Sequence, residues 1–225
     1  GILLAAAATL RPAFAQATMK IGVIGSGKIG GTVGKLWVKA GHPVLFSSRH
    51  PGELAGMVKE LGPLARAGTV AEALAFGDVV LLAIPYGAYP AFGRDNSAAL
   101  KGKIVLDAGN ASPTRDGSEI AAEAEKDGIG IVSQKYLPGT RLVRAFNTLN
   151  FRILENQANR VAPRLAVPLA GDDAAAMKVA EQLVSDAGFD PVVVGGLKDA
   201  RRIQRGNPGY GQAVGAAELK QKLGL

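Results

Sequence analysis

The chain has 225 residues, and its content of 48% hydrophobic and 20% charged residues is typical of a folded protein rather than a disordered one. It has no cysteine and two histidines, which excludes disulfides and thiolate sites, so we expect no bound metal. The formal net charge is +7, but only 5% of the residues are aromatic and no basic run is interleaved with rings. Nucleic acid is therefore not an expected partner.

The first eighteen residues look like a targeting segment rather than the start of a fold. Ile2–Leu10 is an apolar run, and Ala13-Phe14-Ala15 is a small-x-small pattern that a signal peptidase could cut. The run is too short to cross a bilayer, so no membrane span is expected. We interpret residues 1–18 as the remnant of an export signal, which predicts a periplasmic or exported protein. The alternative is a natural start at Met19 and a cytoplasmic protein.

From Met19 onward, short apolar runs alternate with amphipathic helical patterns. The runs are mostly continuous, as expected for parallel strands that are covered on both faces. Strands are predicted at Lys20–Ile24, Val44–Ser47, Val79–Ile84, Ile104–Asp107, Leu142–Phe146, Leu165–Ala170 and Val192–Val194. The alternation predicts an α/β fold, a Rossmann doubly wound and mostly parallel sheet.

Two helices are marked clearly enough to be bounded. The helix between the first two strands is expected to end at Gly41, and a later one is expected to be capped at its N-terminus by Asp172 and to end at Gly188. The apolar stripe of the first is Ile29, Val33, Leu36, Trp37 and Ala40, and that of the second is Met177, Ala180, Leu183 and Val184. A weak boundary near Asn150 predicts a main domain over residues 19–150 and a small C-terminal α/β lobe over residues 151–225.

A glycine motif follows the first predicted strand directly. It reads Gly25-Ser26-Gly27-Lys28-Ile29-Gly30 and opens into the first helix. In this pattern the first glycine permits a tight turn, the second lets the backbone approach a pyrophosphate, and the third lets helix and strand pack closely. Because the motif lies at the first strand-to-helix junction, it predicts a dinucleotide site. A P-loop is excluded, since Ile29 stands where a magnesium-binding hydroxyl is needed.

The end of the second strand indicates which dinucleotide is bound. An NAD site places an acidic residue there, on the ribose 2′-hydroxyl. This chain instead has Ser47-Ser48-Arg49, whose hydroxyls and guanidinium suit a 2′-phosphate. The sequence therefore predicts NADP(H), with an ordinary polar loop as the alternative interpretation.

The segment from Met19 to Arg49 resembles the opening of the NADPH-dependent reductases of the deazaflavin coenzyme F420. The same fold supplies the NADPH-binding domain of membrane ferric reductases. The resemblance continues through Ala83-Ile84-Pro85, Asp107-Ala108-Gly109-Asn110, Val143–Leu149 and Ala170–Asp173. It implies direct hydride transfer between nicotinamide and a deazaflavin or flavin-like acceptor, stacked in a cleft between the Rossmann core and the small lobe. Such a transfer needs proximity and orientation above all. Accordingly no catalytic residue is assigned, and the chain has no Tyr-x-x-x-Lys pair.

The resemblance also implies site residues. Gly25, Ser26, Gly27, Lys28 and Ile29 would cradle the pyrophosphate, Ser47, Ser48 and Arg49 would bind the 2′-phosphate, Ala83, Ile84 and Pro85 would line the path from adenosine to nicotinamide, and Asn147 and Thr148 would face the nicotinamide or its partner. Each has a structural alternative: Ile84-Pro85 as a strand end, for example, and Asn147 as a loop cap. A homodimer is one possible assembly.

The basic tail departs from the family pattern. Lys198–Lys222 holds six basic residues and two acidic ones, which suits either a solvated surface or an anionic electron acceptor. The acceptor therefore stays open between F420, a flavin, a quinone and a ferric chelate. The alternative functions are reduction of another small substrate, such as an imine, and a non-catalytic NADPH-binding or redox-sensing module.

Overall fold

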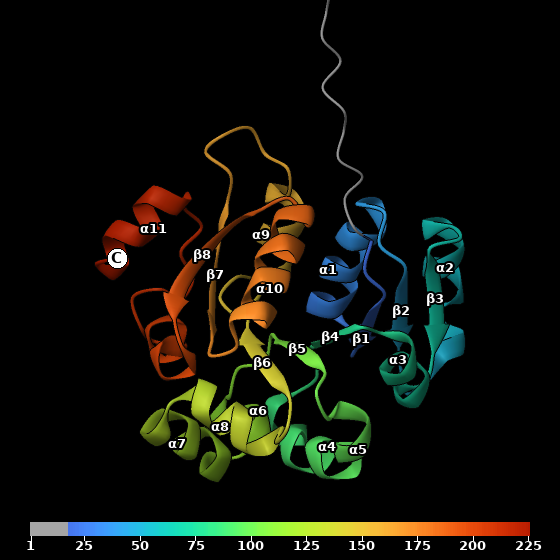
Figure 1. Ribbon diagram of the computed structural model, residues 1–225, viewed down its shortest axis with the longest axis horizontal. Coiled ribbons are helices and arrows are strands. Elements are labelled where there is room, and N and C mark those ends of the chain that lie inside the picture. Colours follow the sequence, from blue (N-terminus) through green and yellow to red (C-terminus); the bar gives the residue numbers. More distant parts are fainter. Residues whose placement is uncertain (1–17) are drawn as a thin grey trace, which may run out of the picture.

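The structure is a computed structural model that describes residues 18–225, so the predicted export signal lies outside the described residues apart from Thr18. One sheet of eight strands forms its centre, in the order β3-β2-β1-β4-β5-β6-β7-β8 (Figure 1). The strands are β1 (Ile21–Ile24), β2 (Val44–Ser47), β3 (Ala65–Gly68), β4 (Val79–Leu82), β5 (Ile104–Asp107), β6 (Arg141–Arg144), β7 (Ala166–Gly171) and β8 (Asp190–Gly195). The first six are parallel to one another in the Rossmann order, which confirms the predicted fold class.

Helices connect the strands and cover both faces of the sheet. They are α1 (Lys28–Lys39), α2 (Ala55–Leu61), α3 (Val70–Phe76), α4 (Tyr89–Asp95), α5 (Ser97–Leu100), α6 (Pro113–Asp116), α7 (Ser118–Asp127), α8 (Ile129–Tyr136), α9 (Phe151–Gln157), α10 (Ala174–Asp186) and α11 (Ala216–Leu223). Three 3-10 helices, η1 (Pro51–Leu54), η2 (Tyr86–Ala88) and η3 (Leu197–Ile203), lie in the connections. Of the two bounded predictions, α1 ends just before Gly41, whose φ of 95° is favoured in glycine, and α10 ends before Gly188.

Each face of the sheet has its own apolar core. On one face α1, α9 and α10 pack on a core that contains Trp37 and Phe146, whose rings meet edge-on at 5.7 Å. On the other, α3, α4 and α8 cover a core that contains Tyr86 and Tyr89, and η3 and α11 cover β7 and β8. Figure 1 shows α1 and α10 together on one side and the α4–α8 helices on the other. Alternate residues of each strand serve the two cores, which explains the continuous apolar runs in the sequence.

Two sequence predictions need correction. The edge strand β3 was not predicted, because its sequence, ARAG, has little apolar surface and includes an arginine and a glycine. The N-cap of α10 is Asp173, not Asp172, since the Asp173 carboxylate accepts the Ala176 N–H at 2.8 Å. The Asp172 carboxylate instead accepts the N–H of Leu197 at 2.9 Å, at the start of η3.

The C-terminal part of the chain continues the same sheet. β7 pairs antiparallel with β6, and β8 pairs parallel with β7. The Trp37 indole N–H donates to the Leu183 carbonyl at 2.7 Å, and the buried His42 and Asp186 side chains meet at 3.0 Å. The first contact joins α1 to α10, and the second joins the segment between α1 and β2 to the end of α10. The division at residue 150 stays a prediction, as do the signal sequence and the homodimer. Within residues 18–225, no helix has the length and apolar character needed to cross a membrane.

Candidate functional site

The glycine loop connects β1 to α1 by a turn that only glycines accommodate. Gly25 has a φ of 93°, and a Cβ on Gly30 would lie 2.1 Å from the Gly25 carbonyl oxygen. Gly27 is different: its φ is −75°, and a Cβ there would meet nothing within 4 Å among the described residues. The protein's own packing thus requires glycine at positions 25 and 30 and leaves the space beside Gly27 open.

The N-terminus of α1 faces that open space with its backbone N–H groups. Gly27 is the N-cap, no side chain of residues 18–225 caps it, and the first turn holds no acidic residue. The first N–H groups of a helix lack intrahelical partners, and the helix dipole makes this end positive. This combination favours an anion. Lys28 adds a positive charge, and its ammonium lies 5.4 Å from the centre of the Phe151 ring.

A cavity of about 910 Å³ brings three predicted segments together at the carboxyl ends of β1, β2 and β4. Its lining includes Gly25–Gly27, Ser47–Arg49 and Ala83–Pro85. Parallel strands of a doubly wound sheet place ligand sites at this edge, where the strand order reverses between β1 and β4. The predicted groups for pyrophosphate, 2′-phosphate and adenosine path therefore share one cavity, and the predicted ligand roles stay proposals.

The end of β2 supplies the polar wall of this cavity. Ser47 is buried, and its hydroxyl has no hydrogen-bonding partner among residues 18–225. The Ser48 hydroxyl accepts the His50 N–H at 3.0 Å, which fixes the turn, and Arg49 is exposed. Sequence reasoning missed Glu53, an acidic residue of η1 that also lines the cavity. Glu53 follows Ser47 and Ser48 by several residues in the chain and lines the same cavity.

Two smaller cavities, each of about 320 Å³, continue from the large one. The first shares Ala83–Pro85 with the large cavity and adds Lys28, Asn110 and Arg115. The second shares Ile29, Ala108 and Asn110 with the first and reaches Asn147 and Thr148. Because neighbouring cavities share lining residues, we refer to the three together as the crevice, which extends along the carboxyl ends of the strands from Arg49 to Thr148.

The far end of this crevice is built on an unusual backbone turn. Phe146 has a φ of 59°, in the left-handed region that a bulky residue rarely adopts. Its ring is buried against Trp37 and Phe189, which holds the turn in place. The turn ends the extended run earlier than predicted, at Arg144. The side-chain amide of Asn147 donates to the Ile203 carbonyl at 3.2 Å, while its buried side-chain oxygen, Oδ1, has no partner within the described chain.

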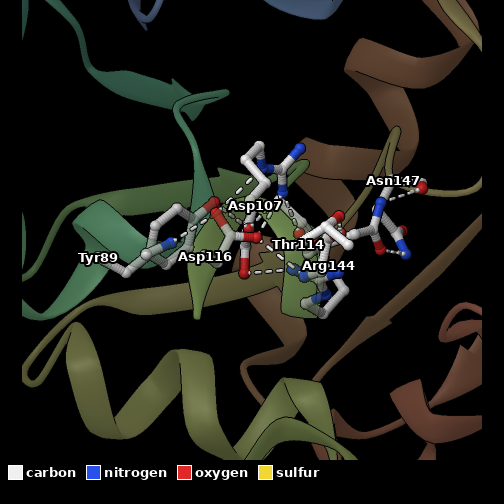
Figure 2. Close-up of polar contacts among 11 residues, drawn as sticks. Tyr89, Asp107, Thr114, Asp116, Arg144 and Asn147 are labelled. Carbon is white, nitrogen blue, oxygen red and sulfur yellow. Dashed lines mark hydrogen bonds and ion pairs between the residues drawn. The ribbon is translucent and has the colours of Figure 1, made fainter. Parts of the chain in front are cut away.

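A buried ion pair lies under the crevice, and sequence reasoning did not identify it. Arg144 and Asp107 are adjacent in the register of β5 and β6; both side chains are fully buried, with Nη1 and Oδ2 2.5 Å apart. Burial alone would lower the pKa of Arg144, but the charge of Asp107 opposes this and the pKa is raised. Figure 2 shows Asp107 with Arg144 and Tyr89, whose hydroxyl donates to Asp107 at 2.6 Å. Burial, above all, raises the pKa of Tyr89, so this hydroxyl stays protonated.

The ion pair holds one glycine by both of its backbone groups. The Gly109 N–H donates to Asp107 Oδ1 at 2.9 Å, and Arg144 Nη2 donates to the Gly109 carbonyl at 2.6 Å. The next residue, Asn110, donates from its amide to the Asn147 carbonyl at 2.6 Å. The loops that follow β5 and β6 are therefore tied together where they line the two smaller cavities.

Asp116 ties the loop after β4 to the same cluster (Figure 2). Its buried carboxylate accepts the N–H groups of Gly87 and Ser112 at 3.0 and 2.9 Å, and it pairs with Arg115 at 2.7 Å. Burial alone would raise the pKa of Asp116, but the hydrogen bonds from Arg115 and from the two backbone groups outweigh it and lower the pKa. Three loops at the carboxyl ends of β4, β5 and β6 are thus fixed relative to one another.

Comparison with known proteins shows which proteins this chain resembles. Residues 20–111 match the model of the family described as NADP oxidoreductase coenzyme F420-dependent. Among curated proteins, the metalloreductase STEAP3 of Rattus norvegicus is 25% identical over 185 residues, which is 82% of this chain and 36% of that protein. The chain spans about a third of the length of the curated relatives it matches.

Two solved structures are similar over most of their length. The protein SMa0349 from Sinorhizobium meliloti is 27% identical with a TM-score of 0.74, covering 90% of this chain and 97% of that one. The structure described as "a putative f420 dependent nadp-reductase" from Arthrobacter sp. FB24 is also 27% identical, with a TM-score of 0.67 and coverage of 81% and 87%. With its Rossmann sheet and glycine loop, this chain is therefore similar to NADP-dependent oxidoreductases, and its residues 20–111 match the F420-dependent NADP oxidoreductase family.

Proposed function

We propose that this protein is an oxidoreductase that binds NADP(H) along the crevice and transfers a hydride between the nicotinamide and a flat deazaflavin or flavin-like acceptor. The observation that carries the proposal is the row of three adjoining cavities from Arg49 through the glycine loop to Thr148. A dinucleotide needs an anion site in the middle of such a crevice, and the N-terminus of α1 lies there.

The residues present fit the cofactor. The open space beside Gly27 is a place where backbone can approach a phosphate, and no packing of residues 18–225 explains a glycine there. The unpartnered buried hydroxyl of Ser47 and the exposed guanidinium of Arg49 suit the 2′-phosphate of NADP(H). Ser47, Ser48 and Arg49 would hold that phosphate, Gly25–Ile29 the pyrophosphate, and Ala83–Pro85 the path between adenosine and nicotinamide.

The chemistry that NADPH supplies when bound is a hydride, which the acceptor takes up together with a proton. The chain's contribution is orientation: Asn110, Asn147 and Thr148 line the far end of the crevice, and the Asp107–Arg144 pair fixes the loops that carry them. A positioning role of this kind accelerates a transfer between two bound molecules without side-chain proton transfer. Asn147 and Thr148 would face the nicotinamide or the acceptor.

The acceptor is tested with the purified protein and NADPH. Oxidation of NADPH is followed by absorbance in the presence of F420, FMN, FAD or a ferric chelate, each added separately. The proposal expects turnover with F420 or a flavin, faster than with the ferric chelate alone. Tight NADPH binding with no turnover on any of these would contradict the enzymatic function and favour a redox-sensing module.

A further inference from the structure

The middle cavity of the crevice, the one that Lys28, Asn110 and Arg115 line, has two positively charged residues in its lining, and they come from two different helices. Lys28 comes from the first turn of α1 and Arg115 from α6, and within the described chain they are the only charged residues that line it. No carboxylate shares the lining to neutralise them. A small, partly enclosed cavity with two cations is a site for an anionic group.

Arg115 is held in a fixed orientation by the protein. Its Nε donates to Asp116 Oδ1 at 3.0 Å, and its Nη2 donates to Asp116 Oδ2 at 2.7 Å and to the Asn110 carbonyl at 2.5 Å. Asp116 in turn is buried and anchored to the N–H groups of Gly87 and Ser112. Nη1 has no hydrogen-bonding partner among residues 18–225, and the side chain is 53% exposed. The guanidinium of Arg115, which lines the cavity, therefore keeps the two N–H groups of Nη1 free to bind a ligand.

The position of this cavity between the other two indicates which anionic group of a bound dinucleotide would occupy it. It shares Ala83–Pro85 with the large cavity and Asn110 with the cavity of Asn147 and Thr148. A dinucleotide that reaches both ends must pass through it with the part between its two nucleosides. In the proposed binding mode the adenosine and the 2′-phosphate would instead lie in the large cavity, which Arg115 does not line.

We propose that Arg115 is a cofactor-binding residue that contacts the phosphate and ribose of the nicotinamide half of NADP(H). This inference rests on the proposed function, since it assumes that the dinucleotide occupies the crevice. Asp116 is its positioning residue, because it holds the guanidinium toward the cavity. Arg115 lies outside the glycine loop and the end of β2, so neither sequence motif indicates it.

Two ligands separate the halves of the cofactor. Adenosine 2′,5′-bisphosphate carries the adenosine and 2′-phosphate but lacks the nicotinamide half, whereas NADPH carries both. In calorimetric titrations, Arg115→Gln is expected to raise the dissociation constant of NADPH by about tenfold or more, as for loss of a hydrogen bond to a charged group. The constant of adenosine 2′,5′-bisphosphate is expected to change less than about twofold. The control is Arg164→Gln, because Arg164 also bonds carbonyl oxygens and faces a carboxylate, but lines none of the three cavities.

A second measurement uses the unaltered protein. An arginine-specific dicarbonyl reagent is expected to modify Arg115 in the free protein, and NADPH is expected to protect it while adenosine 2′,5′-bisphosphate does not, as read by mass spectrometry of the peptide. Equal modification with and without saturating NADPH, or an NADPH affinity that Arg115→Gln leaves unchanged, overturns the inference. Failure of the unaltered protein to bind NADPH at all would instead overturn the proposed function.

Discussion

Asp107 and Arg144 form an ion pair that is fully buried and that clamps Gly109 by both its N–H and its carbonyl. The two residues end adjacent parallel strands, at the edge of the sheet where the crevice lies. Such a pair is costly to desolvate, so its presence beneath the crevice is better explained by orientation of the loops than by stability alone.

Breaking this pair is expected to destabilise the protein strongly. Arg144→Met leaves Asp107 buried without its cation, which costs about 3–5 kcal/mol in the free energy of unfolding. Urea unfolding followed by far-UV circular dichroism measures this value. The matched control is Arg94→Met, which removes an ion pair to Asp95 whose side chains are 72% and 60% exposed and should change stability by less than about 1 kcal/mol. Equal losses from the two substitutions would argue against the pair's structural importance.

The two later glycines of the loop are expected to respond differently to alanine. At Gly30 a Cβ would lie 2.1 Å from the Gly25 carbonyl oxygen, so Gly30→Ala should cost about 1–3 kcal/mol of stability. At Gly27 a Cβ meets no described atom within 4 Å, so Gly27→Ala should cost less than about 1 kcal/mol but weaken NADPH binding. Thermal unfolding and calorimetric titration of both variants separate the two effects. Unchanged NADPH affinity in a folded Gly27→Ala variant would remove Gly27 from the cofactor site.

Asp116 gives the protein a specific acid dependence. Its pKa is lowered from the ordinary value of 3.8 in the folded protein, so its stabilising contribution is fully present above that value and is lost as the pH falls through the lowered folded pKa. Asp116→Asn should therefore reduce the free energy of unfolding by about 1–3 kcal/mol near neutral pH. Denaturant unfolding at a series of pH values should show this difference shrinking below about pH 4. A difference that stayed constant into acid would contradict a charged role for Asp116.

The sequence predicted the part of the site that is local in the chain. Gly25, Gly27 and Gly30 lie within one short segment at the junction of β1 and α1, and Ser47–Arg49 lies at the end of the next strand, so their spacing alone indicated a dinucleotide site. Arg144 and Asp107 are joined only by the register of β5 against β6, and neither residue forms part of a local motif. Arg115 lies in a short helix whose orientation depends on Asp116, Gly87 and Ser112. Long-range pairings such as these follow from the fold and cannot be inferred from spacing.

The same distinction explains the errors in the fold prediction. The sequence of β3 has a low strand propensity. The strand forms because it pairs with the edge of β2, where Ala65 is opposite Val44. At the start of α10 there are two adjacent aspartates, and either could act as the N-cap on the local sequence alone. Asp173 takes it and also pairs with Arg141, while Asp172 serves η3. Tertiary contacts decided between residues that the local pattern could not distinguish.

The most direct test of the account is the affinity of the protein for NADPH and NADH, measured by calorimetry with and without Arg49. The account predicts that the unaltered protein binds NADPH at least about tenfold more tightly than NADH, because the 2′-phosphate gains charge-assisted hydrogen bonds. Arg49→Ala should weaken NADPH binding by about 1–3 kcal/mol and leave NADH nearly unchanged. Equal affinities for the two cofactors, or an NADPH affinity indifferent to Arg49→Ala, would contradict an NADP(H) site at the end of β2.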